Sequence, residues 1–302
     1  MSSIAEDIAR LKTERQAVIL AHNYQRPEVQ DLADFTGDSL ELARKAAALE
    51  NPVIVFCGVT FMAETAAALN PGKLVIMPDE TAGCPMADMI TGADVRALRE
   101  KYPDRKILCY VNSSLEVKAE CDCCCTSSNA YRVAKHYIDA GNRIVFVPDR
   151  HLGGFTATRI GTEFILWPGY CPTHARLTPA LVSAAKAAHP EAKLMVHPEC
   201  PKDIRDAADF VLSTGEMCRE ARESSVQAYL VGTEVGILHR LQRENPAKRF
   251  YPVRDDMVCP NMKKTTPEKL LRALETLQTP VQVQPKMAEQ ARKAIDAMLS
   301  IG

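Results

Sequence analysis

Short apolar runs alternate with amphipathic stretches along the whole chain. The runs at 17–21, 53–56 and 73–77 are largely apolar on both faces, which is typical of strands in a parallel sheet that helices cover on both sides. The stretch at 4–15 places apolar residues at helical spacing and predicts a helix before the first strand. The pattern therefore favours an α/β layer in which helices and parallel strands alternate.

The same order of elements recurs twice more, each time about 88 residues further along the chain. This interval is long enough for one small α/β layer. The sequence therefore predicts an α/β fold of three pseudo-threefold-related αβα three-layer units with parallel sheets and an active site at their common centre. The expected units are 1–90, 91–177 and 178–265, followed by C-terminal helices at 266–302. The recurring strands are expected at 107–111, 143–147, 163–166, 193–196, 228–231 and 249–253.

A Cys-Pro dipeptide follows the fourth predicted strand of each unit. Cys84-Pro85, Cys171-Pro172 and Cys259-Pro260 lie 87 and 88 residues apart. Ligand groups gather beyond the carboxyl ends of the strands in open parallel sheets, so three units that face one axis would bring the three thiols together. A fourth dipeptide, Cys200-Pro201, is off this period and is expected to be structural.

An aspartate opens the short second strand of each predicted unit. Asp34, Asp122 and Asp209 lie 88 and 87 residues apart, so the repeat keeps its register across the chain. In the second unit the strand contains Cys121, Cys123, Cys124 and Cys125, whose counterparts in the other units are mostly strand residues. Because a buried cysteine behaves as a small apolar residue, we expect this run to be core rather than a set of metal ligands.

Other polar positions recur at the predicted ends of the first strands and at the starts of the following helices. The hydroxyl residues are expected at helix N-caps, where backbone N–H groups and helix dipoles can stabilise a carboxylate or phosphate. Glu199 is a candidate general base, and Tyr24 or Tyr110 a candidate general acid. The recurring set is His22, Tyr110 and His197; Tyr24, Asn112 and Glu199; and Ser39, Ser127 and Thr214.

The overall charge and the motifs argue against several classes of function. A net charge of −1 and a pI near 6.7 give no general attraction to nucleic acid or to an anionic membrane. A Walker A motif and a Gly-x-Gly-x-x-Gly motif are both absent from the sequence, so nucleotide binding has no support. The sequence lacks the apolar run of a signal peptide or membrane span, and we expect a cytoplasmic protein whose 11 cysteines are thiols or metal ligands.

Three periodic thiolates are compatible with two kinds of metal site. A [4Fe-4S] cluster that is held by three cysteines keeps one iron open, and that iron can act as a Lewis acid. Zinc that is held by the same three cysteines and His174 is the alternative, because Cys171 and His174 have chelating spacing. A third reading leaves the thiols buried in loops without a metal. The spacing alone does not decide between these readings.

The motifs at these positions resemble those of the quinolinate synthase family of NAD biosynthesis, and the similarity covers nearly the whole chain. The matching stretches are Ala21-His22-Asn23-Tyr24-Gln25, Gly37-Asp38-Ser39, Tyr110-Val111-Asn112-Ser113, Cys125-Thr126-Ser127-Ser128-Asn129-Ala130, Pro168-Gly169-Tyr170-Cys171-Pro172-Thr173-His174, His197-Pro198-Glu199-Cys200, Ser213-Thr214-Gly215-Glu216 and Cys259-Pro260-Asn261-Met262.

The resemblance implies a transferase that condenses iminoaspartate (iminosuccinate) with dihydroxyacetone phosphate to quinolinate, releasing phosphate and two waters. It implies a [4Fe-4S] cluster on Cys84, Cys171 and Cys259, and a functional link to an L-aspartate oxidase or dehydrogenase. It assigns catalytic roles to Tyr24, Glu199, His22 and His174. The substrate-binding positions that it implies are His22, Ser39, Tyr110, Val111, Asn112, Ser127, His197, Pro198, Glu199 and Thr214.

Two other functions are compatible with the residues alone. One is a zinc- or cluster-dependent hydro-lyase that acts on another small dicarboxylate. The other is a non-catalytic cluster sensor or a small-molecule binding module. An assay of iron and sulfide in anaerobically purified protein separates zinc from a cluster, and substrate turnover separates an enzyme from a sensor.

Overall fold

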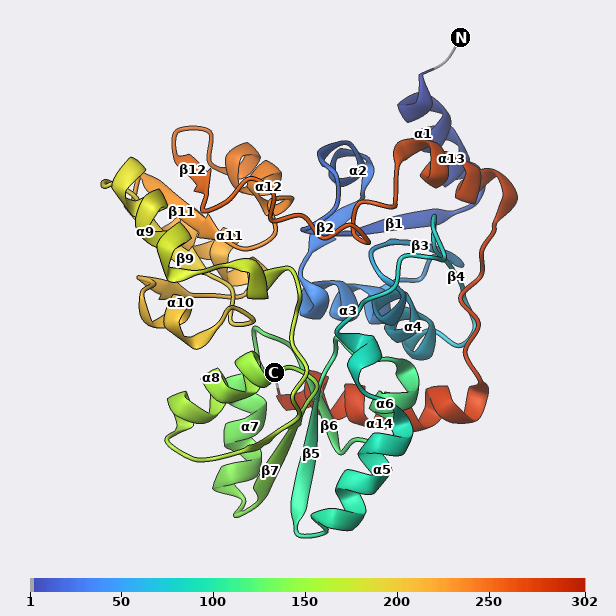
Figure 1. Cartoon of the computed structure of the whole chain (residues 1–302). Helices are drawn as coiled ribbons and strands as arrows, with labels where there is room; N and C mark the ends of the chain where they lie inside the picture. The colour runs from blue at the N-terminus through green and yellow to red at the C-terminus, as the bar shows by residue number, and fades with distance from the viewer. Residues whose placement is uncertain (1–2, 302) are drawn as a thin grey trace.

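The computed structural model describes residues 3–301 and contains three parallel four-stranded sheets. Each sheet has the same strand order, in which the second strand lies at one edge beside the first, followed by the third and the fourth. Figure 1 shows the three sheets arranged around a common centre. The α/β fold with three parallel sheets is therefore confirmed, whereas the boundaries at 90, 177 and 265 stay predictions.

The elements follow one pattern in each unit. The first sheet contains β1 (Ala17–His22), β2 (Phe35–Gly37), β3 (Val53–Cys57) and β4 (Leu74–Ile76), the second β5 (Arg105–Tyr110), β6 (Cys123–Cys125), β7 (Arg143–Val147) and β8 (Ile165–Leu166), and the third β9 (Lys193–Val196), β10 (Phe210–Val211), β11 (Ala228–Gly232) and β12 (Arg249–Pro252). The helices are α1 (Ile4–Glu14), α2 (Pro27–Leu32), α3 (Ser39–Ala48), α4 (Thr60–Leu69), α5 (Gly92–Lys101), α6 (Leu115–Ala119), α7 (Ala130–Asp139), α8 (Arg150–Ile160), α9 (Pro179–Ala188), α10 (Lys202–Asp206), α11 (Thr214–Glu223), α12 (Ile237–Glu244), α13 (Pro267–Thr276) and α14 (Pro285–Ile301).

The central strands are apolar because both of their faces are covered. Every residue of β1 and β3 is buried, and helices pack on either side of this sheet. Three cysteines of the run in the second unit, Cys123, Cys124 and Cys125, form β6 and are fully buried, whereas Cys121 precedes the strand and is half-buried. Their burial in a central layer is the core environment expected from the sequence.

The three periodic aspartates make the same hydrogen bonds in each sheet. The Oδ2 atoms of Asp34, Asp122 and Asp209 accept hydrogen bonds of 2.8 to 2.9 Å from the backbone N–H of Ile19, Ile107 and Leu194 respectively. The backbone N–H of each aspartate donates to the carbonyl of the same strand residue. Each carboxylate therefore extends the pairing between the first and second strands beyond the end of the ladder.

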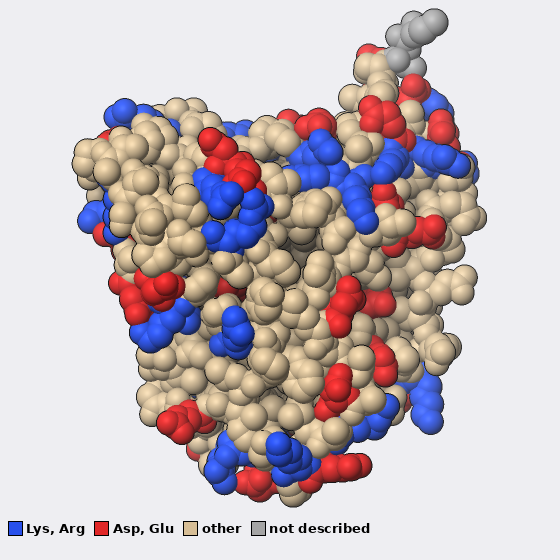
Figure 2. All heavy atoms as spheres, in the orientation of Figure 1, with Lys and Arg blue, Asp and Glu red and all other residues tan. Residues whose placement is uncertain are grey.

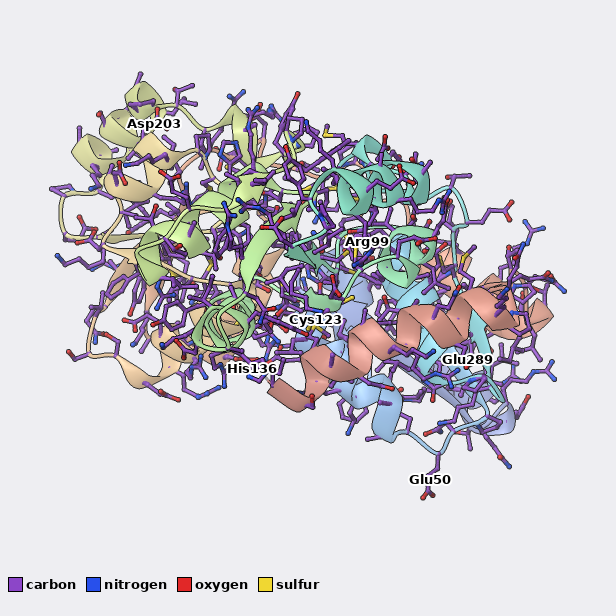
Figure 3. The ribbon with its side chains drawn as sticks, turned by 90° about the horizontal axis from the view of Figure 1, so that it is seen from below. Glu50, Arg99, Cys123, His136, Asp203 and Glu289 are labelled. Atoms are coloured by element: carbon purple, nitrogen blue, oxygen red, sulfur yellow. The ribbon has the colours of Figure 1, made fainter. Side chains whose placement is uncertain are left out.

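The C-terminal helices join the first and second units. Helix α13 packs against α1, whereas α14 contacts α4, α6, α7 and β6. Figure 3 shows α14, which carries Glu289, passing beside Cys123 of β6. Ile295 and Met298 of α14 are fully buried in the central core. Among residues 3–301, no helix is both long enough and apolar enough to cross a lipid bilayer.

We predict that Asp122→Ala lowers the free energy of unfolding by about 1–3 kcal/mol, because it removes the acceptor for the part-buried N–H of Ile107. Asp122→Asn keeps an acceptor oxygen and should lose less. Urea unfolding midpoints at constant m-value measure the change. The control is Asp104→Ala, which removes only an exposed ion pair with Arg143 and should change stability by less than about 0.5 kcal/mol. Equal losses for Asp122→Ala and Asp104→Ala would contradict this role.

Candidate active site

One cavity lies where the carboxyl ends of the three sheets meet. It contains about 640 Å³ of empty space and is lined by residues of all three units. On the face shown in Figure 2, charged side chains lie mostly toward the rim, and the centre between the units is largely uncharged. The residues predicted from the sequence that line the cavity are His22, Tyr24, Ser39, Cys84, Tyr110, Asn112, Ser127, Cys171, His174, His197, Glu199, Thr214 and Cys259.

The three periodic thiols reach the cavity from equivalent turns. After each Cys-Pro step, backbone N–H groups two or three residues further on donate to the sulfur: those of Met86 and Ala87 to Cys84, that of His174 to Cys171, and those of Asn261 and Met262 to Cys259. Proline carries no N–H, so the turn presents the following N–H groups to the thiol. This arrangement suits thiolates that bind a metal.

Burial makes these thiols poor acids when no cation is present. It raises the pKa of Cys84 to about 12, and it also raises the pKa of Cys171 and of Cys259. The negative charge of a Cys259 thiolate further raises the pKa of Cys84, and the negative charge of a Cys84 thiolate further raises the pKa of Cys171. The three thiols therefore interact electrostatically. A bound metal would supply the positive charge that three buried thiolates need.

The geometry does not match a single ion that is held by all three cysteines. Within the described residues, one group places three metal-binding atoms within 4.8 Å of one another, and it consists of Cys171, His174 and Glu199. Cys84 and Cys259 are outside this group. Tetrahedral zinc has Zn–S bonds of about 2.3 Å and would need its ligand sulfurs closer together. Cys84, Cys171 and Cys259 as placed therefore do not form one compact mononuclear site.

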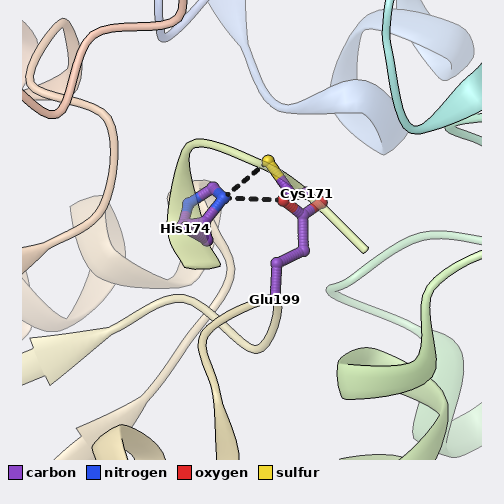
Figure 4. Close-up of side chains that lie close together, drawn as sticks. All are labelled: Cys171, His174 and Glu199. Carbon is purple, nitrogen blue, oxygen red and sulfur yellow. Dashed lines mark hydrogen bonds and ion pairs between the residues drawn. The ribbon is translucent and has the colours of Figure 1, made fainter. Parts of the chain in front are cut away.

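A continuous hydrogen-bond network crosses the cavity. The hydroxyl of Tyr24 lies 2.6 Å from Oγ1 of Thr233, and that Oγ1 lies 2.7 Å from Nε2 of His174. Nδ1 of His174 lies 2.8 Å from Oε2 of Glu199 and 3.1 Å from Sγ of Cys171 (Figure 4). Tyr110 donates to Oε1 of Glu199 at 2.5 Å. Tyr24 and Glu199, which come from different units, are thus connected through two intermediate side chains.

The protonation states in this network follow from burial and contact. Burial opposes ionisation of Glu199, but His174 and His197, together with hydrogen bonds from His174 and Tyr110, lower its pKa below the usual range. Burial raises the pKa of Tyr24 and of Tyr110 well above 10, and the negative charge of Glu199 adds to both shifts. Within this network Glu199 is therefore a carboxylate between neutral phenols.

Two histidines at equivalent positions are neutral. Burial lowers the pKa of His22 and of His197 to about 3, and the carboxylate of Glu199 only partly offsets this. Nδ1 of His22 accepts the N–H of Tyr24, and Nδ1 of His197 accepts the N–H of Glu199. These bonds leave Nε2 of each ring for another partner, and in His197 that partner is the hydroxyl of Ser127 at 3.2 Å.

The starts of the three helices differ from the expectation by one or two residues. Asp38 and Ser213, rather than Ser39 and Thr214, are the N-caps of α3 and α11, because their side chains accept the first free N–H groups. In α7 the N-cap is Asn129, which follows Ser127 by two residues. The expected caps were therefore wrong. Since other residues take the capping position, the hydroxyl groups of Ser39, Ser127 and Thr214 are left to line the cavity.

Two residues expected at the site lie elsewhere. Val111 borders a small neighbouring cavity beside α3 and α4, and Pro198 borders another beside α7 and α8. Neither lines the central cavity, so a side-chain contact to a ligand there is not supported. Cys200 is fully buried and its thiol donates to the carbonyl of Gly232, in keeping with the structural role expected for it.

Sequence reasoning missed several residues of the site. Thr233 and Glu234 follow β11, and Glu234 accepts the N–H of Cys259 and forms a 2.9 Å ion pair with Lys263. Glu234 is fully buried, and burial raises its pKa, which the ammonium group of Lys263 partly offsets. Their position after a buried strand was the available signal. They were missed because they occur in one unit and not in the others.

The amide of Asn112 has a buried oxygen that is available to a ligand. Its Nδ2 donates to Oε1 of Glu199 at 3.2 Å, whereas its Oδ1 is buried and has no hydrogen-bond partner within the described residues. Buried acceptors are rarely left unpaired. The atom is therefore placed to accept a hydrogen bond from a molecule bound in the cavity.

A cavity at the carboxyl ends of parallel strands, into which histidines, phenols, carboxyl groups and three thiols converge, is that of an α/β enzyme. The family model described as "Quinolinate synthetase A protein" matches residues 6–300. The chain is 52% identical to the quinolinate synthase of Dehalococcoides mccartyi over 298 residues, which covers 99% of this chain and 98% of the relative. It is 49% identical to that of Methanoregula boonei with the same coverage, and 45% identical to that of Caldicellulosiruptor saccharolyticus over 302 residues, covering 100% and 99%. The chain belongs to the quinolinate synthase family of NAD biosynthesis.

We predict that Thr233→Val breaks the connection between Tyr24 and His174. It leaves Nε2 of a buried histidine without a partner and should lower the free energy of unfolding by about 1–3 kcal/mol. In ¹⁵N-histidine-labelled protein, the imidazole nitrogens of His174 should shift while those of the exposed His136 stay unchanged. Thr233→Ser keeps the hydroxyl and is the matched control. Unchanged His174 signals in Thr233→Val would show that the network does not position this ring.

Proposed function

We propose that this chain is a quinolinate synthase that condenses iminoaspartate with dihydroxyacetone phosphate and releases phosphate and two waters. The observation that carries the proposal is the convergence of Cys84, Cys171 and Cys259, one from each unit, on one cavity with Tyr24 and Glu199. The full-length similarity to quinolinate synthases supports the same activity. The reaction involves no net oxidation or reduction, so the metal centre need not carry electrons.

The donor set fits a [4Fe-4S] cluster. Cys84, Cys171 and Cys259 would hold three of its irons, and the N–H groups of the Cys-Pro turns would stabilise the thiolates. When bound, the cluster supplies a Lewis acid at the iron without a cysteine, which favours loss of a hydroxyl group from substrate. The other residues of the site would bind the substrates and transfer protons.

Anion binding in this site depends on local groups. The cavity lining contains no arginine or lysine, although both proposed substrates carry negative charge. The starts of α3, α7 and α11 supply the hydroxyls of Ser39, Ser127 and Thr214, together with the positive ends of their helix dipoles. We assign to these groups the binding of the substrate carboxylates and phosphate. The Nε2 atoms of His22 and His197, whose rings are neutral, would orient the substrate.

Proton transfer is assigned to the two ends of the network. Glu199 is a buried carboxylate and takes a proton from a substrate carbon next to the leaving hydroxyl. Tyr24 keeps its proton in the resting site and donates it to a leaving oxygen. His174 and Thr233 lie between them and can return a proton from Glu199 to Tyr24 after each elimination.

Two wider assignments accompany this proposal. The three units at 1–90, 91–177 and 178–265 act as one catalytic body with the C-terminal segment at 266–302. Iminoaspartate would be delivered by an L-aspartate oxidase or dehydrogenase, because an amino acid must lose two electrons to become an imine.

A mononuclear metal site is the second candidate. The mutual proximity of Cys171, His174 and Glu199 favours it, since thiolate, imidazole and carboxylate together suit zinc. Such a site would make the protein a zinc-dependent hydro-lyase and would leave Cys84 and Cys259 without a function. Metal content separates the two candidates.

We predict that anaerobically purified protein contains about four irons and about four sulfides per chain and little zinc. Cys84→Ala, Cys171→Ala and Cys259→Ala should each lose most of the iron, because each removes one cluster ligand. The matched control is Cys124→Ala, in which a buried cysteine of β6 is removed and the iron content should stay unchanged. One zinc per chain, lost in Cys171→Ala and kept in Cys84→Ala, would favour the second candidate.

We predict that Glu199→Gln lowers kcat for quinolinate formation by about 10²–10⁴-fold while the iron content stays at the wild-type level. Glutamine keeps the shape and the acceptor for Tyr110 but cannot take a proton. Product formation under anaerobic conditions and iron content are measured on the same preparation. Wild-type turnover in Glu199→Gln would remove the base assignment, and no turnover in the iron-loaded wild type would contradict the proposed reaction.

A further inference from the structure

A second hollow lies outside the cavity, at the surface between the starts of α3, α7 and α11. Its lining includes Leu40, Ser128 and Gly215, each of which directly follows a hydroxyl residue of the inner cavity. Asp38 borders both spaces. The first turns of the three helices therefore separate the inner cavity from the outer hollow by the thickness of about one residue.

Three arginines recur at one position in the three helices that surround the hollow. Arg44, Arg132 and Arg219 lie 88 and 87 residues apart, each five residues after a hydroxyl residue of the cavity, and all three line the hollow. We call these three residues the arginine ring. All three side chains are exposed, so they remain hydrated and can meet a ligand from solution.

The guanidinium groups of the ring are largely uncommitted. In the described part of the chain, Arg44 and Arg132 have no hydrogen bond or ion pair, and Arg219 has one ion pair, at 3.9 Å, with Glu216. Surface arginines elsewhere, such as Arg96 and Arg143, have carboxylate partners at 2.7 and 3.0 Å. The ring therefore keeps donors and positive charge available for an anion.

Cations outnumber acids around the hollow. Of its six cationic side chains, Arg222 and Arg240 are paired with Glu223 and Glu244, which leaves four against the carboxyl groups of Asp38, Glu41 and Glu216, a formal excess of one positive charge. These acids are already engaged, since each accepts backbone N–H groups at a helix start. The six cations are Arg44, Lys45, Arg132, Arg219, Arg222 and Arg240.

The close approach of two helices keeps this region narrow. A Cβ atom on Gly215, at the start of α11, would lie 2.7 Å from Oδ2 of Asp38, the N-cap of α3. The absence of a side chain at 215 lets the two helix starts meet beside the boundary between hollow and cavity. The positive ends of the helix dipoles add to the field of the arginine ring at this point.

We propose that the arginine ring is an external binding site for small dianions, the chemical class of dicarboxylates and phosphate monoesters, and that it concentrates them beside the inner cavity. The guanidinium groups of the ring attract the anion at the surface, and neutral donors bind it in the inner cavity. This explains why the cavity lining has no arginine or lysine. The identity of the natural dianions rests on the proposed function, whereas the binding site itself does not.

Inorganic phosphate is the probe for the site, and ³¹P line broadening measures its binding to the full chain. The test variant is R44Q/R132Q/R219Q, and the control R272Q/K286Q/K293Q removes the same charge from exposed positions of α13 and α14. We expect the dissociation constant of phosphate at low ionic strength to rise about tenfold in the ring variant and to change little in the control. Raising the salt concentration should abolish the difference. Equal phosphate affinity in both variants overturns the proposal.

Turnover by the iron-loaded enzyme gives a second readout. We expect the ring variant to lose about tenfold in kcat/KM at low ionic strength with kcat unchanged, because the ring does not touch the reacting atoms. Weakened phosphate binding with unchanged kcat/KM would show an adventitious surface site and overturn its role in substrate capture. If the wild type forms no quinolinate, the proposed reaction fails, and the phosphate measurement still decides whether the ring binds dianions.

Discussion

The desolvation of three half-buried thiols around one cavity is the constraint on which the rest of the structure depends. Burial raises the pKa of Cys84 to about 12, so the site cannot hold three thiolates without positive charge. The lining of the inner cavity contains no arginine or lysine to supply it, and the N–H groups of the Cys-Pro turns, with Lys263 beside Cys259, offset only part of the cost. The proposed metal centre would supply this charge, and it would also explain why the chain brings three sheets to one axis. Each sheet ends in a turn that delivers one sulfur, and no single sheet could surround the centre.

The arrangement separates two kinds of positive potential. The metal centre would act at the Cys-Pro turns, whereas helix dipoles act at the part of the lining where α3, α7 and α11 begin. A dianion between these walls meets favourable potential on both sides without a buried arginine or lysine. Burying such a side chain would cost free energy and would compete with the metal for the thiolates. The arginines stay outside, where water solvates them and their charge still reaches an approaching anion.

Recurrence along the chain made much of this predictable from sequence. The thiols, the aspartates such as Asp122 and the three hydroxyl positions keep one register, and register survives because each unit repeats the same backbone. Features that occur once could not be predicted in this way. Thr233 bridges Tyr24 and His174, yet only its position after a buried strand marks it, because the bridge exists only where all three units meet. The N-caps differed by one residue, since Asp38 and Ser213 can cap as well as the hydroxyl residues that follow them.

The repeat also explains how one scaffold position provides different chemistry. The N–H of Tyr24 donates to His22, and the N–H of Glu199 donates to His197, so the turn after the first strand is the same in units one and three. The backbone holds the ring, and the next side chain is free to change. A phenol stands there in the first unit, an amide (Asn112) in the second and a carboxylate in the third. Three identical residues would give a symmetric site with no distinction between acid and base. Divergence at this one position therefore gives the cavity a proton donor, a neutral anchor and a proton acceptor at fixed places around the same centre.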